Sequence, residues 1–335
     1  MTTRAIVRVP ASTSNLGAGF DCVGVAIDRW LEVTALIEPD ARESLRLERG
    51  GTLAAVAVAP EHDRLVAAFI AACRAAGRVV PHGLVLRASS KIPVARGLGS
   101  SAAATVAGAA AANALLRLDL DDLGLVQLCA SLEGHPDNVV PAIHGGAVLA
   151  IPAPVGSAEA DHVRAPVIAP IELHASLALV LAVPDFEVET TYMRAALPGM
   201  VHHTLAARAA ALGAALVSGL TSGHPAVLER ALDDVLHVPY RREFIVGYDA
   251  VVAAARAAGA YGTTLSGSGS SLCAVAPRPA AREVAAAMIA AWQSEGVAAE
   301  PIVCETPAAG HSARVERGDG QESGIAASAA GQART

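Results

Sequence analysis

Two glycines and two serines lie together in GLGSSA at residues 97–102, directly before a long run of small residues. A strand-like segment at 82–90 precedes them, and a helix-like segment at 100–118 contains the serines and continues the chain. Glycines let backbone N–H groups approach an anion, and a helix N-terminus adds roughly half a positive charge. The pattern predicts a phosphate-binding loop, with a tight turn capped by a serine as the alternative.

Two better-known phosphate motifs do not fit this segment. The Walker loop needs its own lysine, and the single lysine of the chain, Lys91, precedes the loop. The protein-kinase strand lysine is also absent unless Lys91 serves. The string matches G-x-G-x-x-A of dinucleotide-binding folds, but the eight residues SSKIPVAR at 89–96 lie between it and the apolar part of the strand. The acids that follow, Asp119, Asp121 and Asp122, are expected to begin a helix, which disfavours a dinucleotide site.

A second group of reactive side chains lies in EGHPDN at 133–138, where Glu133, His135 and Asp137 alternate. A metal site is disfavoured because no other histidine stands at an H-x3-H spacing beside His135. A Ser-His-Asp hydrolase needs a G-x-S-x-G elbow, and the nearest string, SGSGS at 266–270, lacks its flanking glycine pattern. Both are therefore minor alternatives.

The composition limits which proteins could hold these residues. At 335 residues, the chain is long enough for two domains. Apolar residues make up 53% and aromatic ones 3%, so an aliphatic core is predicted. With 17% charged residues and a net charge of −7, no basic surface suggests nucleic acid. Five cysteines without a C-x-x-C pair fit a reducing compartment.

No targeting segment is evident at the N-terminus, where MTTRAIVRVPAS lacks the apolar region of a signal peptide. No apolar run nears the ~18 to 20 residues that a membrane helix needs. We therefore expect a soluble, cytoplasmic protein that binds neither a membrane nor nucleic acid.

Strands and helices mix irregularly along the chain, which predicts an α+β fold rather than a strict βαβ repeat. A first strand is expected from Ala5 to Pro10, followed by a polar loop at 12–21. From Thr306 onward, large apolar residues almost disappear, which predicts a disordered tail. Further strands are expected at 31–39, 82–90, 145–152, 177–184, 261–267, 270–277 and 298–305, and helices at 63–77, 100–118, 120–134, 203–219, 244–260 and 280–296.

Three segments together resemble the motifs of the GHMP kinases (galactokinase, homoserine kinase, mevalonate kinase and phosphomevalonate kinase). They are VRVPASTSNLGAGFD at 7–21, PVARGLGSSAA at 93–103 and TTLSGSGSSLCAV at 263–275, in the family's order and at its usual spacings. Within the family, the chain is most similar to homoserine kinase. The segments that carry this similarity are LEGHPDNVVPAIHGG at 132–146, VETTYMRAALPG at 188–199 and VPYRREFIVGY at 238–248.

The resemblance implies the two-domain GHMP kinase fold, with a ribosomal-protein-S5-like N-terminal domain and a ferredoxin-like C-terminal domain. We expect the first at 1–152, the second at 153–305 and the disordered tail at 306–335, with the active site between the domains. The implied activity is ATP-dependent phosphorylation of the side-chain hydroxyl of L-homoserine to O-phospho-L-homoserine, a step of threonine biosynthesis. The resemblance also allows a homodimer.

The family holds ATP without a Walker lysine, so the resemblance places the nucleotide on the second motif. About four negative charges would meet backbone N–H groups, the helix dipole and Mg²⁺. Mg²⁺ takes oxygen ligands, and the resemblance implies Ser100 or Ser101 with Glu133, which would otherwise be a solvated helix residue. The implied ATP-binding residues are Pro93, Val94, Ala95, Arg96, Gly97, Leu98, Gly99, Ser100, Ser101, Ala102 and Ala103.

An amino-acid substrate needs three kinds of partner. Its ammonium group needs an acceptor, which the resemblance assigns to Asp21. Its carboxylate suits the fork of arginine, assigned to Arg194 and Arg241, and Asn138 is implied to orient the hydroxyl. The implied substrate-binding residues are Asn15, Asp21, His135, Asn138, Arg194, Arg241 and Gly267.

The expected catalytic residues are Asp137 and Asn138. Asp137 is the only carboxylate of the HPDN string that could take the hydroxyl proton. A loose transition state also allows the proton to pass late to the phosphate, with no side-chain base. An Asx-turn or a helix N-cap after Pro136 is the structural alternative for Asp137.

Two departures from the homoserine kinase pattern leave the substrate open. The third motif lacks the usual proline in SGSGSS at 266–271, and Leu205 and Ala209 stand where an acid and an asparagine are common. Neither departure removes an expected ATP ligand. The alternatives are a kinase of another hydroxylated amino acid or amino alcohol, or a protein of this fold that binds nucleotide or ligand without kinase activity.

Overall fold

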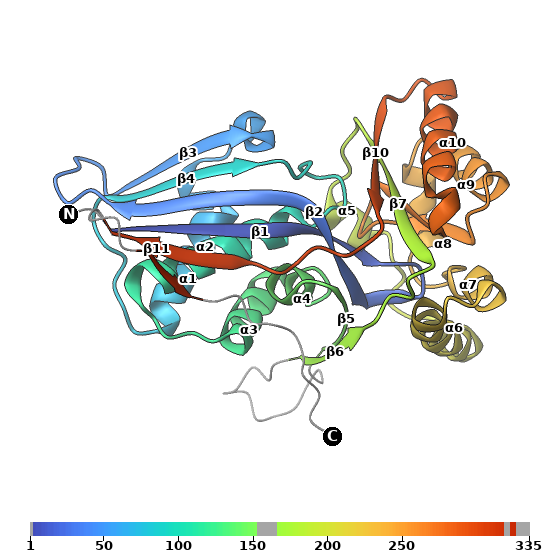
Figure 1. The fold of residues 1–335 in the computed structure, drawn as a ribbon, viewed down its shortest axis with the longest axis horizontal. Coiled ribbons are helices and arrows are strands. Elements are labelled where there is room, and N and C mark those ends of the chain that lie inside the picture. The colour runs from blue at the N-terminus through green and yellow to red at the C-terminus, as the bar shows by residue number, and fades with distance from the viewer. Residues whose placement is uncertain (1–2, 153–165, 318–321, 326–335) are drawn as a thin grey trace.

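The structure is a computed structural model that describes residues 3–152, 166–317 and 322–325 of the chain. Within these residues the strands form two sheets, one of eight strands and one of four. Figure 1 shows the larger sheet running across the molecule and the smaller one at its right-hand end. The predicted α+β fold is confirmed.

The larger sheet has the order β12-β11-β1-β2-β4-β3, and β5 and β6 extend it from β2. Its described strand pairs are antiparallel except β3 with β4. The long strands β1 and β2 are buried over most of their length and form its centre. The strands are β1 (Arg4–Asn15), β2 (Gly19–Ile37), β3 (Leu45–Gly51), β4 (Leu84–Ser90), β5 (Ala147–Ile151), β6 (Val167–Ile171), β11 (Ser312–Glu316) and β12 (Glu322–Ile325).

Four helices cover this sheet. Helices α2 and α4 pack on β1 and β2, and α1 and α3 pack against α2. Small residues make up most of α2, so its neighbour comes close, and a Cβ on Gly108 would collide with the Leu65 carbonyl of α1. The helices are α1 (Arg64–Ala75), α2 (Ser100–Leu116), α3 (Asp122–Glu133) and α4 (Val139–His144).

The smaller sheet has the antiparallel order β10-β7-β9-β8. Helix α10 packs on β7 and β10, and α9 packs on α10 and β8. The strands are β7 (Leu177–Pro184), β8 (Gly262–Leu265), β9 (Leu272–Pro277) and β10 (Ala299–Cys304). The helices are α5 (Thr190–Ala195), α6 (His203–Ser222), α7 (Pro225–Ala231), α8 (Val238–Arg241), α9 (Tyr248–Ala257) and α10 (Ala281–Ser294), with 3₁₀ turns at Thr52–Ala55, Pro60–His62, Arg242–Phe244 and Arg278–Ala280.

The first strand does not end at Pro10, as predicted, but continues to Asn15. Pro10 lies at a register shift between β1 and β2, so its missing N–H does not end the pairing. The polar residues 12–14 of the expected loop are fully buried. Their hydroxyls are hydrogen-bonded to Asn138 and Ser266, which allows polar side chains in this place.

The prediction of a disordered tail at 306–335 is wrong for its first part. Strand β11 pairs with β1, from Arg4 with Glu316 to Arg8 with Ser312. Its side chains are mostly small or charged, so composition gives no sign of a strand whose order comes from backbone pairing. Residues 318–321 and 326–335 lie outside the described residues.

The larger sheet therefore takes in more of the chain than the predicted N-terminal domain at 1–152. It includes β6 and also β11, to which the chain returns after completing the smaller sheet. The domain limits at 152 and 305 stay a prediction.

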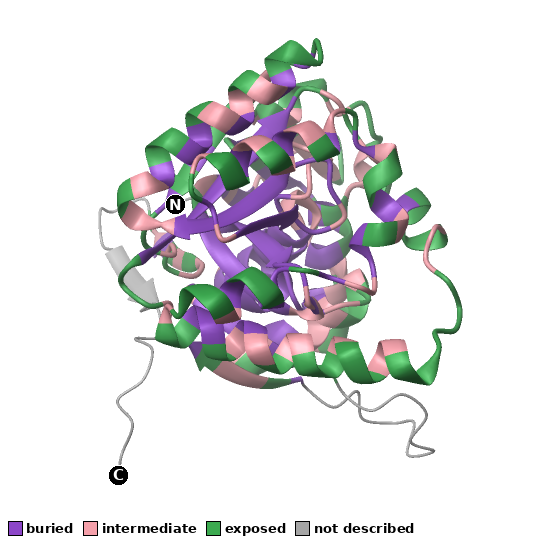
Figure 2. Cartoon of the chain, turned by 90° about the vertical axis from the view of Figure 1, so that its right-hand side faces the viewer, coloured by how far each residue is buried: buried purple, intermediate pink, exposed green. Residues whose placement is uncertain are grey.

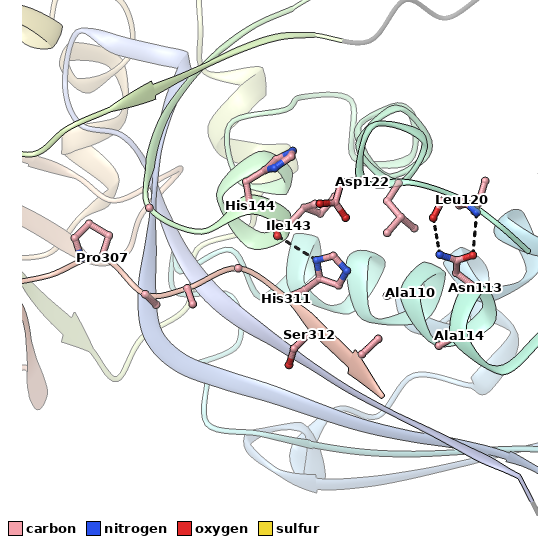
Figure 3. A pocket seen from close by; sticks show the side chains of 16 residues that line it. Ala110, Asn113, Ala114, Leu120, Asp122, Ile143, His144, Pro307, His311 and Ser312 are labelled. Atoms are coloured by element: carbon pink, nitrogen blue, oxygen red, sulfur yellow. Dashed lines mark hydrogen bonds between the residues drawn. The ribbon is translucent and has the colours of Figure 1, made fainter. Parts of the chain in front are cut away.

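Residues 307–311, which we call the strap, join β10 to β11 across the C-terminal end of α4 (Figure 3). The backbone N–H of His311 donates to the Ala142 carbonyl at 2.9 Å, and its ring Nδ1 donates to the Ile143 carbonyl at 3.1 Å. These bonds satisfy carbonyls that a helix end leaves open. The strap, α4 and the facing parts of α2 and α3 enclose a cavity of about 420 Å³.

The prediction that no segment is long and apolar enough to cross a membrane is wrong for α6, which meets both conditions by length and composition. Only Leu216, Gly219 and Leu220 of this helix are buried. A single helix of this kind is weak evidence for a membrane span, because helices of soluble proteins meet the same test.

Figure 2 shows how burial is distributed over the molecule, with buried strands at the centre and the exposed faces of helices outside.

Candidate active site

The three motifs meet in one cavity of about 370 Å³. The predicted site residues that line it are Asn15, Asp21, Ala95, Gly97, Gly99, Ser100, Ser101, Ala102, Glu133, His135, Asp137, Asn138, Arg194, Arg241 and Gly267. The structure places the remaining predicted ATP-binding residues elsewhere. Leu98 and Ala103 are buried in the core, while Pro93, Val94 and Arg96 line a second cavity of about 750 Å³.

The second motif forms a turn whose backbone is in the left-handed region. Gly97 and Gly99 have φ values of 73° and 65°, and a Cβ on Gly97 would collide with the Ser266 carbonyl of the third motif. The Ser266 hydroxyl donates to the Gly97 carbonyl at 2.7 Å, so the two glycine-rich loops are joined. Helix α2 begins at Ser100 with Gly99 as its N-cap and no side-chain cap. The serine-capped alternative is therefore wrong, and the first N–H groups of α2 are left for another acceptor.

Glu133 ends α3 beside the first turn of α2. Its carboxylate accepts hydrogen bonds from Ser101 Oγ at 3.0 Å and Thr105 Oγ1 at 2.6 Å, and Arg64 Nη1 lies 3.7 Å away. Its side chain is only 5% exposed, so it is not a solvated helix residue. Among the residues that the structure describes, no group of three or more His, Cys, Asp or Glu side chains could hold a metal.

The HPDN turn between α3 and α4 buries a hydrogen-bonded pair. His135 Nδ1 donates to Asp137 Oδ1 at 2.5 Å, and Asp137 is 2% exposed. Burial alone would raise the pKa of Asp137, but the hydrogen bond and charge of His135, together with Ser14 and Arg194, outweigh it, so this pKa lies below its usual value. For His135, burial lowers the pKa, and Asp137 raises it by more. The N-cap of α4 is Asn138 and no side chain caps it, so the N-cap alternative for Asp137 is wrong.

Asn138 is held by the first motif. Its Oδ1 accepts from Ser12 Oγ, and its Nδ2 donates to Ser14 Oγ, each at 2.9 Å. A Cβ on Gly99 would lie 3.0 Å from Asn138 Oδ1, so this amide stands directly beside the phosphate-loop backbone. Both ends of the amide are fixed, which gives it a single orientation in the cavity.

Asp21 and Arg194 form a bidentate ion pair. Arg194 Nη1 and Nη2 donate to Asp21 Oδ2 and Oδ1, each at 3.0 Å. Asn15 supports the same turn, because its Oδ1 accepts from the Asp21 N–H at 2.9 Å and its Nδ2 donates to the Gly267 carbonyl at 2.7 Å. The two side chains predicted to hold opposite charges of the substrate therefore hold each other in this structure.

Arg241 is a buried cation of a different kind. Only 1% of it is exposed, and within the described part of the chain no carboxylate lies within 4.0 Å of its guanidinium. Its Nε donates to the Met193 carbonyl at 3.0 Å, and its Nη1 lies 3.3 Å from His237 Nδ1. Burial, and then the charge of Arg194, lower its pKa to about 10. The group therefore stays charged at neutral pH while lacking an anion.

Two family models match the chain. They describe the GHMP kinases N terminal domain, at residues 63–146, and the GHMP kinases C terminal, at residues 207–294. The chain belongs to the GHMP kinases. This GHMP kinase is 39% identical over 301 residues to a homoserine kinase from Picosynechococcus sp., covering 89% of the chain and 95% of the relative. It is 35% identical over 294 residues to a homoserine kinase from Synechocystis sp., covering 88% of the chain and 93% of the relative.

Solved structures agree with this assignment. A homoserine kinase from Cytophaga hutchinsonii has a TM-score of 0.80 and 27% identity, covering 92% of this GHMP kinase and 97% of that chain. The L. major mevalonate kinase in complex with R-mevalonate has a TM-score of 0.68 at 18% identity, covering 89% and 95%, and therefore shows the fold alone.

Two residues beside the predicted arginines, Phe20 and His237, were not among the predicted site residues of this GHMP kinase. The Phe20 ring stacks on His237 with 5.0 Å between centroids, and the guanidinium carbons of Arg241 and Arg194 lie 5.3 and 6.0 Å from its centroid. His237 precedes Arg241 by four residues, one helical turn, and this spacing is the signal that could have found it.

Proposed function

We propose that this GHMP kinase transfers a phosphoryl group from ATP to the side-chain hydroxyl of L-homoserine and releases O-phospho-L-homoserine, a step of threonine biosynthesis. The observation that carries the proposal is the cavity itself. It joins a backbone-built anion site at residues 97–102 to a wall that bears Asp21, Arg194 and Arg241. The similarity to homoserine kinases across nearly the whole chain supports the same substrate.

The phosphates of ATP would lie on the uncapped N-terminus of α2, where N–H groups and the helix dipole favour anions. The second cavity, lined by Pro93 and Val94, would take the nucleoside because it begins at the same motif. Ser101 and Glu133 supply adjacent hard oxygen atoms, which suits Mg²⁺ together with phosphate oxygens and water. When bound, Mg²⁺ would neutralise charge that develops on the transferred group.

The amino acid would replace the ion pair of Asp21 and Arg194 with its own charges. Its ammonium group satisfies Asp21, and its carboxylate satisfies Arg194 and Arg241, so neither side of the pair is left without a partner. A substrate that carries only one of these charges would leave one member of the pair unmatched. The charges at this end therefore favour a zwitterion.

The hydroxyl would lie at Asn138, which stands beside the phosphate-loop backbone. Asp137 is ionised and already accepts from His135, and its lowered pKa makes it a weak base. We therefore assign Asp137 and Asn138 to orienting the hydroxyl, and the proton passes late to the phosphoryl group, as a loose transition state allows. A cytoplasmic location and a homodimer belong to this proposal as expectations.

The test is ADP release with ATP and Mg²⁺ against L-homoserine, L-threonine, L-serine, mevalonate and galactose. We expect the highest kcat/KM for homoserine. Higher turnover of another hydroxylated amino acid or amino alcohol would keep the ATP site and reject the substrate. ATP binding without turnover of any of them would favour a nucleotide-binding protein without kinase activity.

A further inference from the structure

The contacts of Arg241 satisfy only part of its hydrogen-bonding capacity. Arg241 is only 1% exposed, and a buried guanidinium needs partners for its N–H groups. Met193 supplies a carbonyl to Nε and His237 a ring nitrogen to Nη1, and both partners are neutral acceptors. For Nη2, we find no hydrogen bond among the described residues, and Arg241 lines the cavity.

The contacts of His237 allow one tautomer. Its Nε2 lies 3.2 Å from the Gly17 carbonyl, which can only accept, so Nε2 carries a proton. Its Nδ1 faces Arg241, which can only donate, so Nδ1 carries none. Burial, helped by the charge of Arg241 and opposed by that of Asp234, lowers the pKa of His237 to about 4 and keeps the ring neutral. The Gly17 carbonyl therefore sets which nitrogen accepts.

Asp234, the nearest carboxylate to this ring, is occupied elsewhere. Its Oδ2 accepts from the backbone N–H groups of His237 and Val238, each at 2.7 Å, and lies 3.8 Å from His237 Nε2. It fixes the backbone turn that leads into α8 and does not bond Arg241. The Phe20 ring covers the other face of the pair.

We infer that His237 is a positioning residue that holds the Arg241 guanidinium toward the cavity as a neutral acceptor. A carboxylate at this position would also orient the guanidinium, but it would cancel the charge that attracts the substrate carboxylate. A neutral His237 ring therefore orients Arg241 and leaves its positive charge uncancelled. The inference rests on the proposed function, because it takes an amino-acid carboxylate as the ligand of Arg241.

Three variants of His237 separate its effect on the orientation of Arg241 from its effect on charge, and two of them, asparagine and aspartate, are isosteric. His237→Asn offers a neutral oxygen near the position of Nδ1, His237→Asp offers a charged one, and His237→Ala offers none. We expect KM for homoserine to rise about tenfold or more in the alanine and aspartate variants, with asparagine restoring most of it. KM for ATP should stay within about twofold in all three, because they leave the phosphate loop intact. The exposed His174→Asn and His174→Asp are the matched controls.

Equal KM values for homoserine in the asparagine and aspartate variants would overturn the inference, as would parallel rises for both substrates. Since the variants could fail to fold, the wild-type full chain gives a second test. Nitrogen-15 NMR of its assigned His237 ring should report the neutral Nε2–H tautomer at pH 6 to 8. A protonated ring or the Nδ1–H tautomer would also overturn it. Absence of homoserine turnover by the wild-type chain would instead reject the proposed function.

Discussion

The two ends of the candidate active-site cavity are built from different parts of the chain. At one end, residues 97–102 offer backbone N–H groups from a single turn and the start of one helix. At the other, charged side chains come from β2, α5 and α8, which are far apart in the sequence. The geometry of the first end comes from local conformation, and that of the second depends on long-range placement.

The two ends also differ in how their charges are balanced. The backbone end contains no titratable side chain within 97–102 and no capping carboxylate, so its attraction for anions is a property of the turn. The side-chain end stores its charges in pairs: Asp21 holds Arg194, and His135 holds Asp137. Among the charged side chains at this end of the cavity, Arg241 alone has no anionic partner in the described part of the chain, so we expect it to attract a substrate carboxylate most strongly.

The largest effect should come from changing the backbone end. In Gly97→Ala, the new Cβ meets the Ser266 carbonyl at a φ of 73°, so the turn must shift. We expect kcat/KM to fall by about 10²- to 10³-fold, with loss of ATP binding measured by calorimetry. The control is Gly77→Ala, which also has a positive φ, 63°, but nothing within 4 Å of the new Cβ. Equal losses in both variants would mean that general destabilisation by a strained residue, and not displacement of this loop, causes the effect.

The next largest effect should come from the side-chain end. Arg241→Ala removes the cation that lacks a partner, and we expect KM for homoserine to rise about 10²-fold while KM for ATP is nearly unchanged. Steady-state kinetics with each substrate varied in turn provides the measurement. The exposed neighbour Arg242→Ala is the control. A matching rise in KM for ATP would break the separation of the two ends.

The backbone end was predictable from sequence because its signal is local. GLGSSA before a helix predicts a loop that brings backbone N–H groups to an anion, and the structure has positive φ values at both glycines and an uncapped helix start there. The side-chain end was predicted only through the resemblance to a family. No pattern in the sequence says that Asp21 pairs with Arg194, since 173 positions separate them.

Two other features escaped prediction for the same physical reason. The STS run at 12–14 was predicted to lie in a polar loop. It is buried because Asn138 and Ser266 supply hydrogen-bond partners for its hydroxyls, which the sequence alone does not show. Strand β11 and the strap read as disordered because their order comes from backbone bonds to β1 and α4. Composition reports what a segment can bury, and it does not report which backbone lies beside it.

A smaller effect should follow from loosening α4, the helix that begins after Asn138. Helix α4 follows directly after Asn138, and His311 of the strap bonds the carbonyls at its far end. We expect His311→Ala to lower the free energy of unfolding by about 1 kcal/mol, measured by urea denaturation. The exposed His174→Ala should change it by less than about 0.5 kcal/mol. No loss in the His311 variant would mean that the backbone bonds of the strap suffice.

The smallest effect should be a pH dependence confined to the side-chain end. The pKa of His135 is raised on folding, so its contribution to stability is complete below its ordinary value of 6.5 and is lost as pH rises through the folded value. The pKa of Asp137 is lowered, so its contribution is complete above its ordinary value of 3.8 and is lost on acidification. The pair therefore stabilises the fold most between these two values.

His135→Gln should accordingly lose more unfolding free energy relative to the wild type at pH 5 than at pH 8.5, in urea denaturation at both values. His135 is largely buried, so solvent screens this difference less than it would screen an exposed pair. The exposed His174→Gln, measured in parallel at both pH values, is the control. If the loss in His135→Gln is the same at both pH values, folding does not raise the pKa of His135, and the side-chain end has no more pH dependence than the backbone end.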